Sequence, residues 1–97
     1  MLFVIFAHDK PDGGKARQAH RPAHLEYLKS EAAMIRTAGP LLADDGERMT
    51  GSMLVIEAED ANAARAFAEA DPFHRNGVFA DVEIQAWRAS VGTVSFA

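Results

Sequence analysis

Four stretches of the chain carry the hydrophobic patterns of β-strands. Residues 2–7 (LFVIFA) and residues 52–57 (SMLVIE) are apolar runs with no regular polar positions. Such runs, rich in β-branched and aromatic residues, predict strands that are buried on both faces. Residues 78–87 alternate between two faces, which predicts a half-exposed strand. A short strand is also predicted at residues 40–43, where Pro40 favours an edge position.

Two segments between these runs have helical spacing. The first helix is predicted to begin at Pro22, because proline is well tolerated at the first helical position, and to end at Gly39. Its apolar residues recur at spacings of three and four, as in a buried helical stripe: Leu25, Leu28, Ala32 and Ile35. The second helix is predicted from the N-cap residue Asp60 to Ala70, and Pro72 ends it because a residue before proline disfavours helical geometry.

The predicted order of elements is βαββαβ, which indicates an α+β protein with the ferredoxin-like arrangement of an antiparallel sheet. Right-handed crossovers set the direction of every element. They place the end of the first strand, the start of the first helix and the end of the second helix at one end of the sheet. His24, in the first turn of one helix, and Asp71, at the last position of the other, are therefore expected to meet.

The two strongest strand patterns have no polar face, yet two helices can cover only one face of a sheet. The other face needs a cover of its own, since exposed apolar patches of that size mark interaction sites. A second copy of the chain, packed sheet on sheet, supplies this cover. The chain is therefore expected to form a homodimer through its sheet faces.

Composition and charge exclude several classes of protein. The 97 residues suit one small domain, and the formal net charge of −4 argues against a nucleic-acid partner. No apolar run is long enough for a membrane span, so no membrane partner is expected. The absence of cysteine excludes thiolate chemistry and fits a cytoplasmic location.

Several short motifs, in their order and spacing, resemble the YciI-like (YCII-related domain) family. They are the strand at 2–6 and the segments 9–11 (DKP), 21–25 (RPAHL), 38–41 (AGPL), 50–52 (TGS), 70–73 (ADPF), 77–79 (GVF) and 82–84 (VEI). The resemblance implies a single domain over residues 1–97, with a core at about 1–87 and a C-terminal extension at 88–97. Within the extension, residues 93–96 are predicted to add a short strand.

The resemblance also implies a dimeric α/β barrel of ferredoxin-like subunits and a site centred on His24 and Asp71. One branch of the family includes a dehydrochlorinase that acts on chlorinated aromatic diols and triols, and muconolactone isomerases share a similar barrel. A carboxylate beside an imidazole fixes its orientation for general acid/base catalysis. Two plainer interpretations stay open: His24 caps or packs the helix start, and Asp71 belongs to a turn before proline.

Three more residues are candidates for substrate contact: Arg21, Ser52 and His8. Arg21 can pair with a carboxylate or a phenolate, although an arginine beside a helix start is usually solvated. Ser52 and His8 are predicted near the same end of the sheet. No base is identifiable beside Ser52, so it is not a candidate nucleophile.

The remaining histidines do not predict a metal site. His20 and His24 are four residues apart, but Pro22 lies between them and no glutamate accompanies them as in zinc proteases. His8 and His74 do not complete a known ligand pattern. Neither a metal nor a cofactor is expected.

The sequence therefore predicts a small cofactor-free enzyme that uses His24 and Asp71 for elimination, isomerisation or hydrolysis of a small organic, phenolic or anionic substrate. The alternative is a non-catalytic dimeric module that binds a small molecule or a protein. The sequence does not decide between the two, and it does not identify the substrate.

Overall fold

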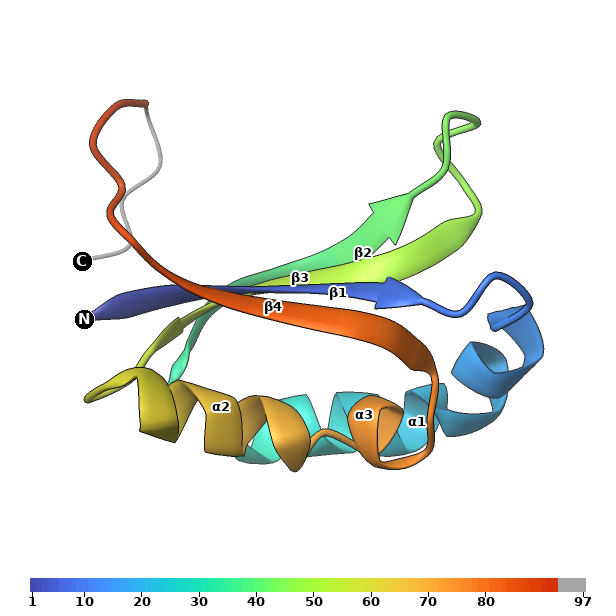
Figure 1. Ribbon diagram of the computed structural model, residues 1–97, viewed down its shortest axis with the longest axis horizontal. Coiled ribbons are helices and arrows are strands. Elements are labelled where there is room, and N and C mark those ends of the chain that lie inside the picture. Colours follow the sequence, from blue (N-terminus) through green and yellow to red (C-terminus); the bar gives the residue numbers. More distant parts are fainter. Residues whose placement is uncertain (93–97) are drawn as a thin grey trace.

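The computed structural model, which describes residues 1–92, has the predicted ferredoxin-like arrangement. Its elements are β1 (Leu2–Asp9), α1 (Gly14–Ser30), β2 (Ile35–Leu42), β3 (Met49–Glu57), α2 (Ala61–Glu69), α3 (Pro72–Arg75) and β4 (Phe79–Trp87). The strand order is β2-β3-β1-β4, and every neighbouring pair is antiparallel. The helices lie together on one side of the sheet (Figure 1). The predicted α+β class and antiparallel sheet are confirmed.

The core lies between the sheet and these helices. Alternate residues of the two central strands face the helices, with Phe3 of β1 opposite Ile56 of β3 and Ile5 opposite Leu54. None of these four side chains is more than 3% exposed. They form one cluster with residues in and just before α2: Ala58, Ala64, Phe67 and Ala68. This packing holds α2 against the middle of the sheet.

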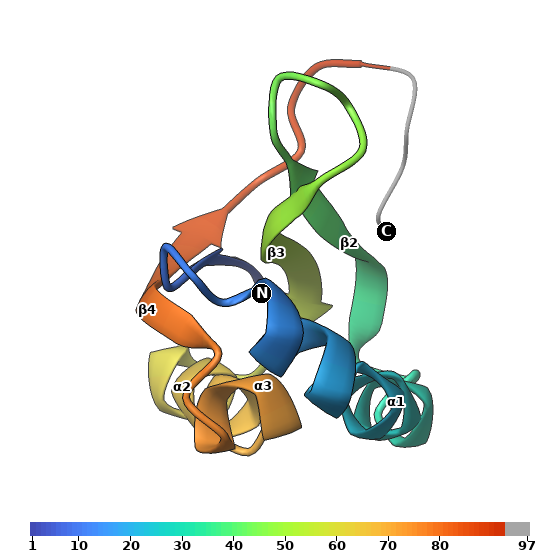
Figure 2. The ribbon, with the colours of Figure 1, turned by 90° about the vertical axis from the view of Figure 1, so that its right-hand side faces the viewer.

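Helix α1 differs from the prediction at its beginning. It spans Gly14–Ser30 and contains Pro22 instead of starting there. A proline inside a helix removes one backbone hydrogen bond and bends the helix. Figure 2 shows the consequence, because the blue first part of α1 runs at an angle to its later turns. None of the helices within residues 1–92 is long and apolar enough to cross a membrane.

The end of α1 also differs, because residues predicted as its last turns belong to β2. Ile35 pairs with Ile56 and Gly39 pairs with Met53 of β3. The helical spacing of apolar residues continues past Ser30. The backbone hydrogen-bonding groups of this segment nevertheless pair with β3 and not with each other in a helix. β2 is an edge strand, so the prediction for Pro40 is confirmed although the strand is longer than expected.

The other elements lie close to their predicted places. The side chain of Asp60 accepts a hydrogen bond from the backbone N–H of Ala63 at 2.9 Å, so its role as N-cap of α2 is confirmed. β3 begins at Met49, slightly before the predicted start, and β4 begins at Phe79. The short helix α3 was not predicted. The strand predicted at residues 93–96 lies outside the described residues.

The face of the sheet opposite the helices carries apolar side chains. Val4 lies opposite Val55 on this face, and Phe6 lies opposite Met53. Trp87, at the end of β4, is on the same face and is 41% exposed. Figure 1 shows no helix on this side of the sheet. The expectation that a second copy covers the face stays a prediction.

Candidate active site

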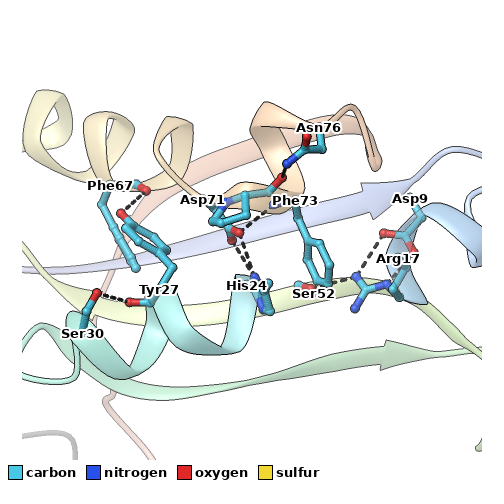
Figure 3. A network of polar contacts seen from close by, with 11 residues as sticks. Asp9, Arg17, His24, Tyr27, Ser30, Ser52, Phe67, Asp71, Phe73 and Asn76 are labelled. Atoms are coloured by element: carbon cyan, nitrogen blue, oxygen red, sulfur yellow. Dashed lines mark hydrogen bonds and ion pairs between the residues drawn. The ribbon is translucent and has the colours of Figure 1, made fainter. Parts of the chain in front are cut away.

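The structure brings His24 and Asp71 together, as the predicted topology requires. Nδ1 of His24 lies 2.8 Å and 3.0 Å from the two carboxylate oxygens of Asp71. His24 is only 6% exposed and Asp71 only 5%. His24 comes from the interior of α1, and Asp71 comes from the junction between α2 and α3 (Figure 3). Because His24 lies well inside its helix, it does not cap the helix start.

The position of Asp71 corrects part of the sequence interpretation. Helix α2 ends at Glu69, and Asp71 is the N-cap of α3. Its Oδ1 accepts a hydrogen bond from the backbone N–H of Phe73 at 2.9 Å. A carboxylate is favourable at a helix N-terminus, so this position suits Asp71 better than the predicted position at the end of α2. The cap and the contact with His24 together hold the carboxylate in one orientation, and the turn interpretation is correct as well.

This pairing determines which nitrogen of His24 can act as a base. An ionised carboxylate only accepts hydrogen bonds, so Nδ1 carries the hydrogen and donates it to Asp71. In the neutral ring Nε2 then keeps its lone pair. Nε2 has no hydrogen-bond partner among residues 1–92, and His24 lines a cavity of about 190 Å³. A histidine that lines a cavity and keeps a free lone pair has what general base catalysis requires.

The ring of Phe73 fixes the plane of the histidine. Phe73 is completely buried, and its ring stacks on His24 with centroids 3.9 Å apart and planes inclined by 11°. The guanidinium carbon of Arg17 lies 4.6 Å from the centroid of the same ring. Figure 3 shows Phe73 between His24 and Arg17. The ring therefore keeps the two polar groups apart while it contacts both.

A second buried ion pair, which the sequence interpretation missed, lies beyond Phe73. Arg17 is 5% exposed, and its Nε and Nη2 donate to the carboxylate of Asp9 at 2.6 Å and 3.0 Å. Nη2 also donates to Oγ of Ser52 at 2.8 Å. Asp9 is the last residue of β1, and Arg17 is in the first turn of α1. The network thus ties the start of α1 to β1 and β3.

The signal for Arg17 was present in the sequence but was hidden by the predicted helix start. Arg17, Arg21, His24 and Leu28 recur at spacings of four, three and four, which is one face of a continuous helix. All four line the cavity. A helix predicted to begin at Pro22 could not include Arg17 on that face.

The cavity lies between α1 and the neighbouring strands β2 and β3. Arg21 and Ser52, both predicted as contact residues, line it, and Arg21 is exposed at its rim. Apolar side chains from all three elements complete its walls, including Leu28, Pro40 and Leu54. The cavity therefore combines a few polar groups with apolar walls, as small-molecule sites commonly do.

His8, the third predicted contact residue, does not reach this cavity. Its neighbour Ala7 is buried on the helix side, so the alternation along β1 turns His8 to the opposite face of the sheet. There its Nδ1 lies 3.1 Å from Oδ1 of Asp81. The prediction placed His8 near the correct end of the sheet but did not establish which face of the sheet meets the cavity. Among residues 1–92, no three His, Cys, Asp or Glu side chains are grouped so that they could hold a metal ion.

Tyr27 connects α1 to α2 through a hydrogen bond near His24. Its hydroxyl donates a hydrogen bond to the backbone carbonyl of Phe67 at 2.8 Å (Figure 3). Burial, together with the smaller effects of the nearby negative charges of Glu31 and Asp71, raises the pKa of Tyr27 to about 12. Tyr27 therefore stays protonated and keeps donating at physiological pH.

Sequence comparison places this chain in a known family. The profile of the YCII-related domain matches residues 1–88. The chain belongs to this family. Protein YciI of Escherichia coli O6:H1 is 38% identical over 95 residues, which cover 91% of this chain and 97% of that protein. An uncharacterised protein of Haemophilus influenzae is 39% identical over 95 residues, which cover 91% of this chain and 97% of that protein.

Solved structures of other proteins resemble this YCII-related chain as well. The 5-chloro-2-hydroxyhydroquinone dehydrochlorinase of Burkholderia phenoliruptrix AC1100, in complex with 2,5-dihydroxybenzoquinone, superimposes with a TM-score of 0.84 and 36% identity. The match covers 93% of this chain and 96% of the dehydrochlorinase. A Pseudomonas aeruginosa protein with a TM-score of 0.53 and 14% identity, covering 92% of this chain and 93% of its own, shares the fold alone.

Proposed function

We propose that this YCII-related protein is a cofactor-free enzyme that catalyses proton transfer on a small single-ring organic molecule. The observation that carries the proposal is the buried His24–Asp71 pair, in which His24 also lines a cavity. His24 acts as general base and then as general acid, and Asp71 keeps its Nδ1 hydrogen in place. The reaction is an elimination, an isomerisation or a hydrolysis, because each of these includes a proton transfer to a general base.

The shape of the cavity supports a small ring as substrate. A space of about 190 Å³ with apolar walls is large enough for one substituted ring. The similar dehydrochlorinase acts on a chlorinated hydroxyhydroquinone, which supports a phenolic substrate for this chain too. In an elimination Nε2 of His24 accepts a proton from a carbon atom of the substrate. The electron pair of the broken C–H bond then expels the leaving group. Arg21 and Ser52 are positioned to contact polar substituents of the ring.

The proposal is tested with a panel of hydroxylated single-ring compounds that includes 5-chloro-2-hydroxyhydroquinone. Turnover is followed by ultraviolet absorbance and by chloride release. His24→Gln and Asp71→Asn should each lower the rate by about 10²–10⁴-fold, which is the usual contribution of general acid/base catalysis. The matched control is His74→Gln, because His74 is exposed and does not line this cavity. Full activity in His24→Gln would refute the proposal.

Nuclear magnetic resonance of the ring nitrogens supplies a second test that needs no substrate. The ¹⁵N shifts of His24 should show hydrogen on Nδ1 and a lone pair on Nε2 in the wild type. Asp71→Asn can present its amide N–H to Nδ1, so it should move the hydrogen to Nε2. If ring compounds bind but none is turned over, the alternative of a non-catalytic binding module is favoured instead.

We also propose that the protein is a homodimer whose copies pack through the open faces of their sheets. The support is the apolar character of that face, where Val4, Phe6, Met53 and Val55 lie on adjacent strands. Light scattering should give about twice the chain mass of 10.5 kDa. Phe6→Asp should yield a monomer, whereas Lys29→Asp on an exposed part of α1 should not change the mass. A wild-type monomer would contradict the proposal.

A further inference from the structure

Helix α1 is held against the rest of the protein mainly by polar contacts. A surface helix is usually held by an apolar stripe that it buries. In α1 the buried side chains are instead the two polar ones, Arg17 and His24. The apolar side chain of Leu28 is only partly buried, and Leu25 is 45% exposed. The position of α1 relative to α2 and α3 therefore depends on directional polar contacts.

Two such contacts join α1 to the segment that contains α2 and α3. Among the side-chain hydrogen bonds of residues 1–92, these are the His24–Asp71 pair and the bond from the Tyr27 hydroxyl to the carbonyl of Phe67 at 2.8 Å (Figure 3). Tyr27 comes three residues after His24, so it lies on the same face of α1 one turn later. Phe67 is 6% exposed and belongs to the core cluster. Tyr27 thus links α1 to a part of α2 that the core holds in place.

The carbonyl of Phe67 is available because α2 ends just before Asp71. In a continuing helix the N–H of Asp71 would bond to the carbonyl of Phe67, four residues earlier. The last turn tightens instead, and this N–H bonds to the carbonyl of Ala68 at 3.2 Å. Within residues 1–92 no backbone N–H bonds to the carbonyl of Phe67. Tyr27 therefore satisfies the acceptor that is released where the chain turns to present Asp71.

We propose that Tyr27 is a positioning residue for the His24–Asp71 pair. By bonding to the free carbonyl of Phe67, it sets the distance between α1 and the end of α2, and so keeps His24 within reach of Asp71. Tyr27 does not line the cavity that His24 lines, so it acts through the pair and not on a substrate. The inference rests on the proposed function for its meaning in catalysis, and it names the group that holds the pair in place.

The test compares the wild type with Tyr27→Phe, which keeps an aromatic ring against Phe67 and removes only the hydroxyl. Saturation transfer from water, followed by nuclear magnetic resonance, gives the exchange rate of the hydrogen on Nδ1 of His24. This exchange reports opening of the pair, and it is faster than global unfolding, so a lower overall stability does not change it. Losing one hydrogen bond should speed the exchange about 2- to 10-fold.

Turnover supplies a second measurement for any compound that the wild type converts. Tyr27→Phe should lower kcat by a similar factor and leave KM unchanged, because the cavity lining is intact. The matched control is Ser30→Ala, which removes another hydroxyl of α1 whose Oγ donates to the carbonyl of Tyr27 at 2.7 Å. Ser30→Ala should change neither the exchange rate nor kcat. An unchanged exchange rate at Nδ1 in Tyr27→Phe would overturn the proposal, whatever happens to turnover.

A chemical substitution tests the same bond in a protein that keeps the tyrosine shape. Tyr27 is the only tyrosine, so 3,5-difluorotyrosine supplied during expression replaces this residue alone. Fluorine lowers the pKa of the phenol, against the opposing effects of burial and of the negative charges of Glu31 and Asp71. A phenolate cannot donate a hydrogen bond. The ratio of Nδ1 exchange rates between modified and unmodified protein should therefore rise as phenolate absorbance appears, and a constant ratio would overturn the proposal.

These measurements separate failure of the positioning role from failure of the proposed function. If His24→Gln keeps full turnover while Tyr27→Phe speeds exchange at Nδ1, the catalytic role of His24 is wrong and the positioning role stands. If turnover depends on His24 but exchange at Nδ1 is the same with and without the Tyr27 hydroxyl, the positioning role is wrong and the proposed function stands.

Discussion

Replacing Phe73 by alanine tests whether this ring holds the site together. Phe73 is fully buried, stacks on His24 and lies under the guanidinium of Arg17. It also meets Phe79 edge to face, with centroids 5.8 Å apart and planes inclined by 79°. The substitution therefore removes apolar burial, two aromatic contacts and one cation–π contact, and it leaves a cavity between two ion pairs.

The size of the effect follows from these contacts. A buried phenylalanine changed to alanine costs about 3–5 kcal/mol of unfolding free energy. Each aromatic pair contributes about 0.5–1.5 kcal/mol beyond simple burial. A desolvated cation–π contact contributes up to about 2 kcal/mol. Phe73→Leu keeps most of the apolar volume and loses only the ring contacts, so we expect it to cost about 1–3 kcal/mol, less than the alanine variant.

The assay is equilibrium unfolding in urea at one fixed protein concentration, since the proposed dimer would make stability depend on concentration. Small domains have a total stability of about 5–15 kcal/mol, so Phe73→Ala should unfold at a much lower urea concentration than the wild type. Phe73→Leu should lie between the two and also lose the proposed activity, because His24 is no longer held in plane. The reasoning is refuted if Phe73→Ala costs less than about 1 kcal/mol, the size of an average substitution.

Two further predictions concern residues outside the cavity. A Cβ atom at Gly51 would collide with the backbone carbonyl oxygen of Ala7, so Gly51→Ala should lower the unfolding free energy by about 1–3 kcal/mol or more. Gly39→Ala has open space and should stay within about 0.5 kcal/mol of the wild type in the same urea assay; equal effects would contradict this. Tyr27, the only tyrosine, should ionise near pH 12 instead of about 10 as seen by tyrosinate absorbance. Because the pKa of Tyr27 is raised in the folded protein, its stabilising contribution is complete below the unfolded pKa and is lost as pH rises toward 12. Tyr27→Phe should lack this loss of stability. An ionisation midpoint near pH 10 in the folded protein would show that burial does not raise the pKa.

Much of the fold was predictable because its signals are local. The apolar runs at residues 2–7 and 52–57 become the two central strands, and Asp60 caps α2 as expected. The order of elements then limits the topology, since crossovers have one hand. For this reason the meeting of His24 and Asp71 followed from sequence although the residues are far apart in the chain. Their shared end of the sheet depends on element direction and not on side-chain detail.

The errors lie where long-range contacts override a local preference. Pro22 is a typical helix start, but the Arg17 ion pair with Asp9 anchors an earlier turn of α1 to the sheet. Residues 31–38 continue a helical spacing, but hydrogen bonds to β3 draw the segment from Ile35 into the sheet. Asp9 is not adjacent in sequence to Arg17, and β3 is not adjacent to the segment that begins at Ile35. Local patterns therefore could not include these contacts.

The sequence by itself determined the class of the fold, the order of its strands and the end of the sheet where His24 and Asp71 lie. Only the tertiary structure decided which groups face the cavity. Strand pairing and alternation turn His8 to the open face and Ser52 to the cavity, and the continuous α1 brings Arg17 beside Phe73. The physical reason is that a side chain's face depends on register and helix phase, and contacts between distant segments set both.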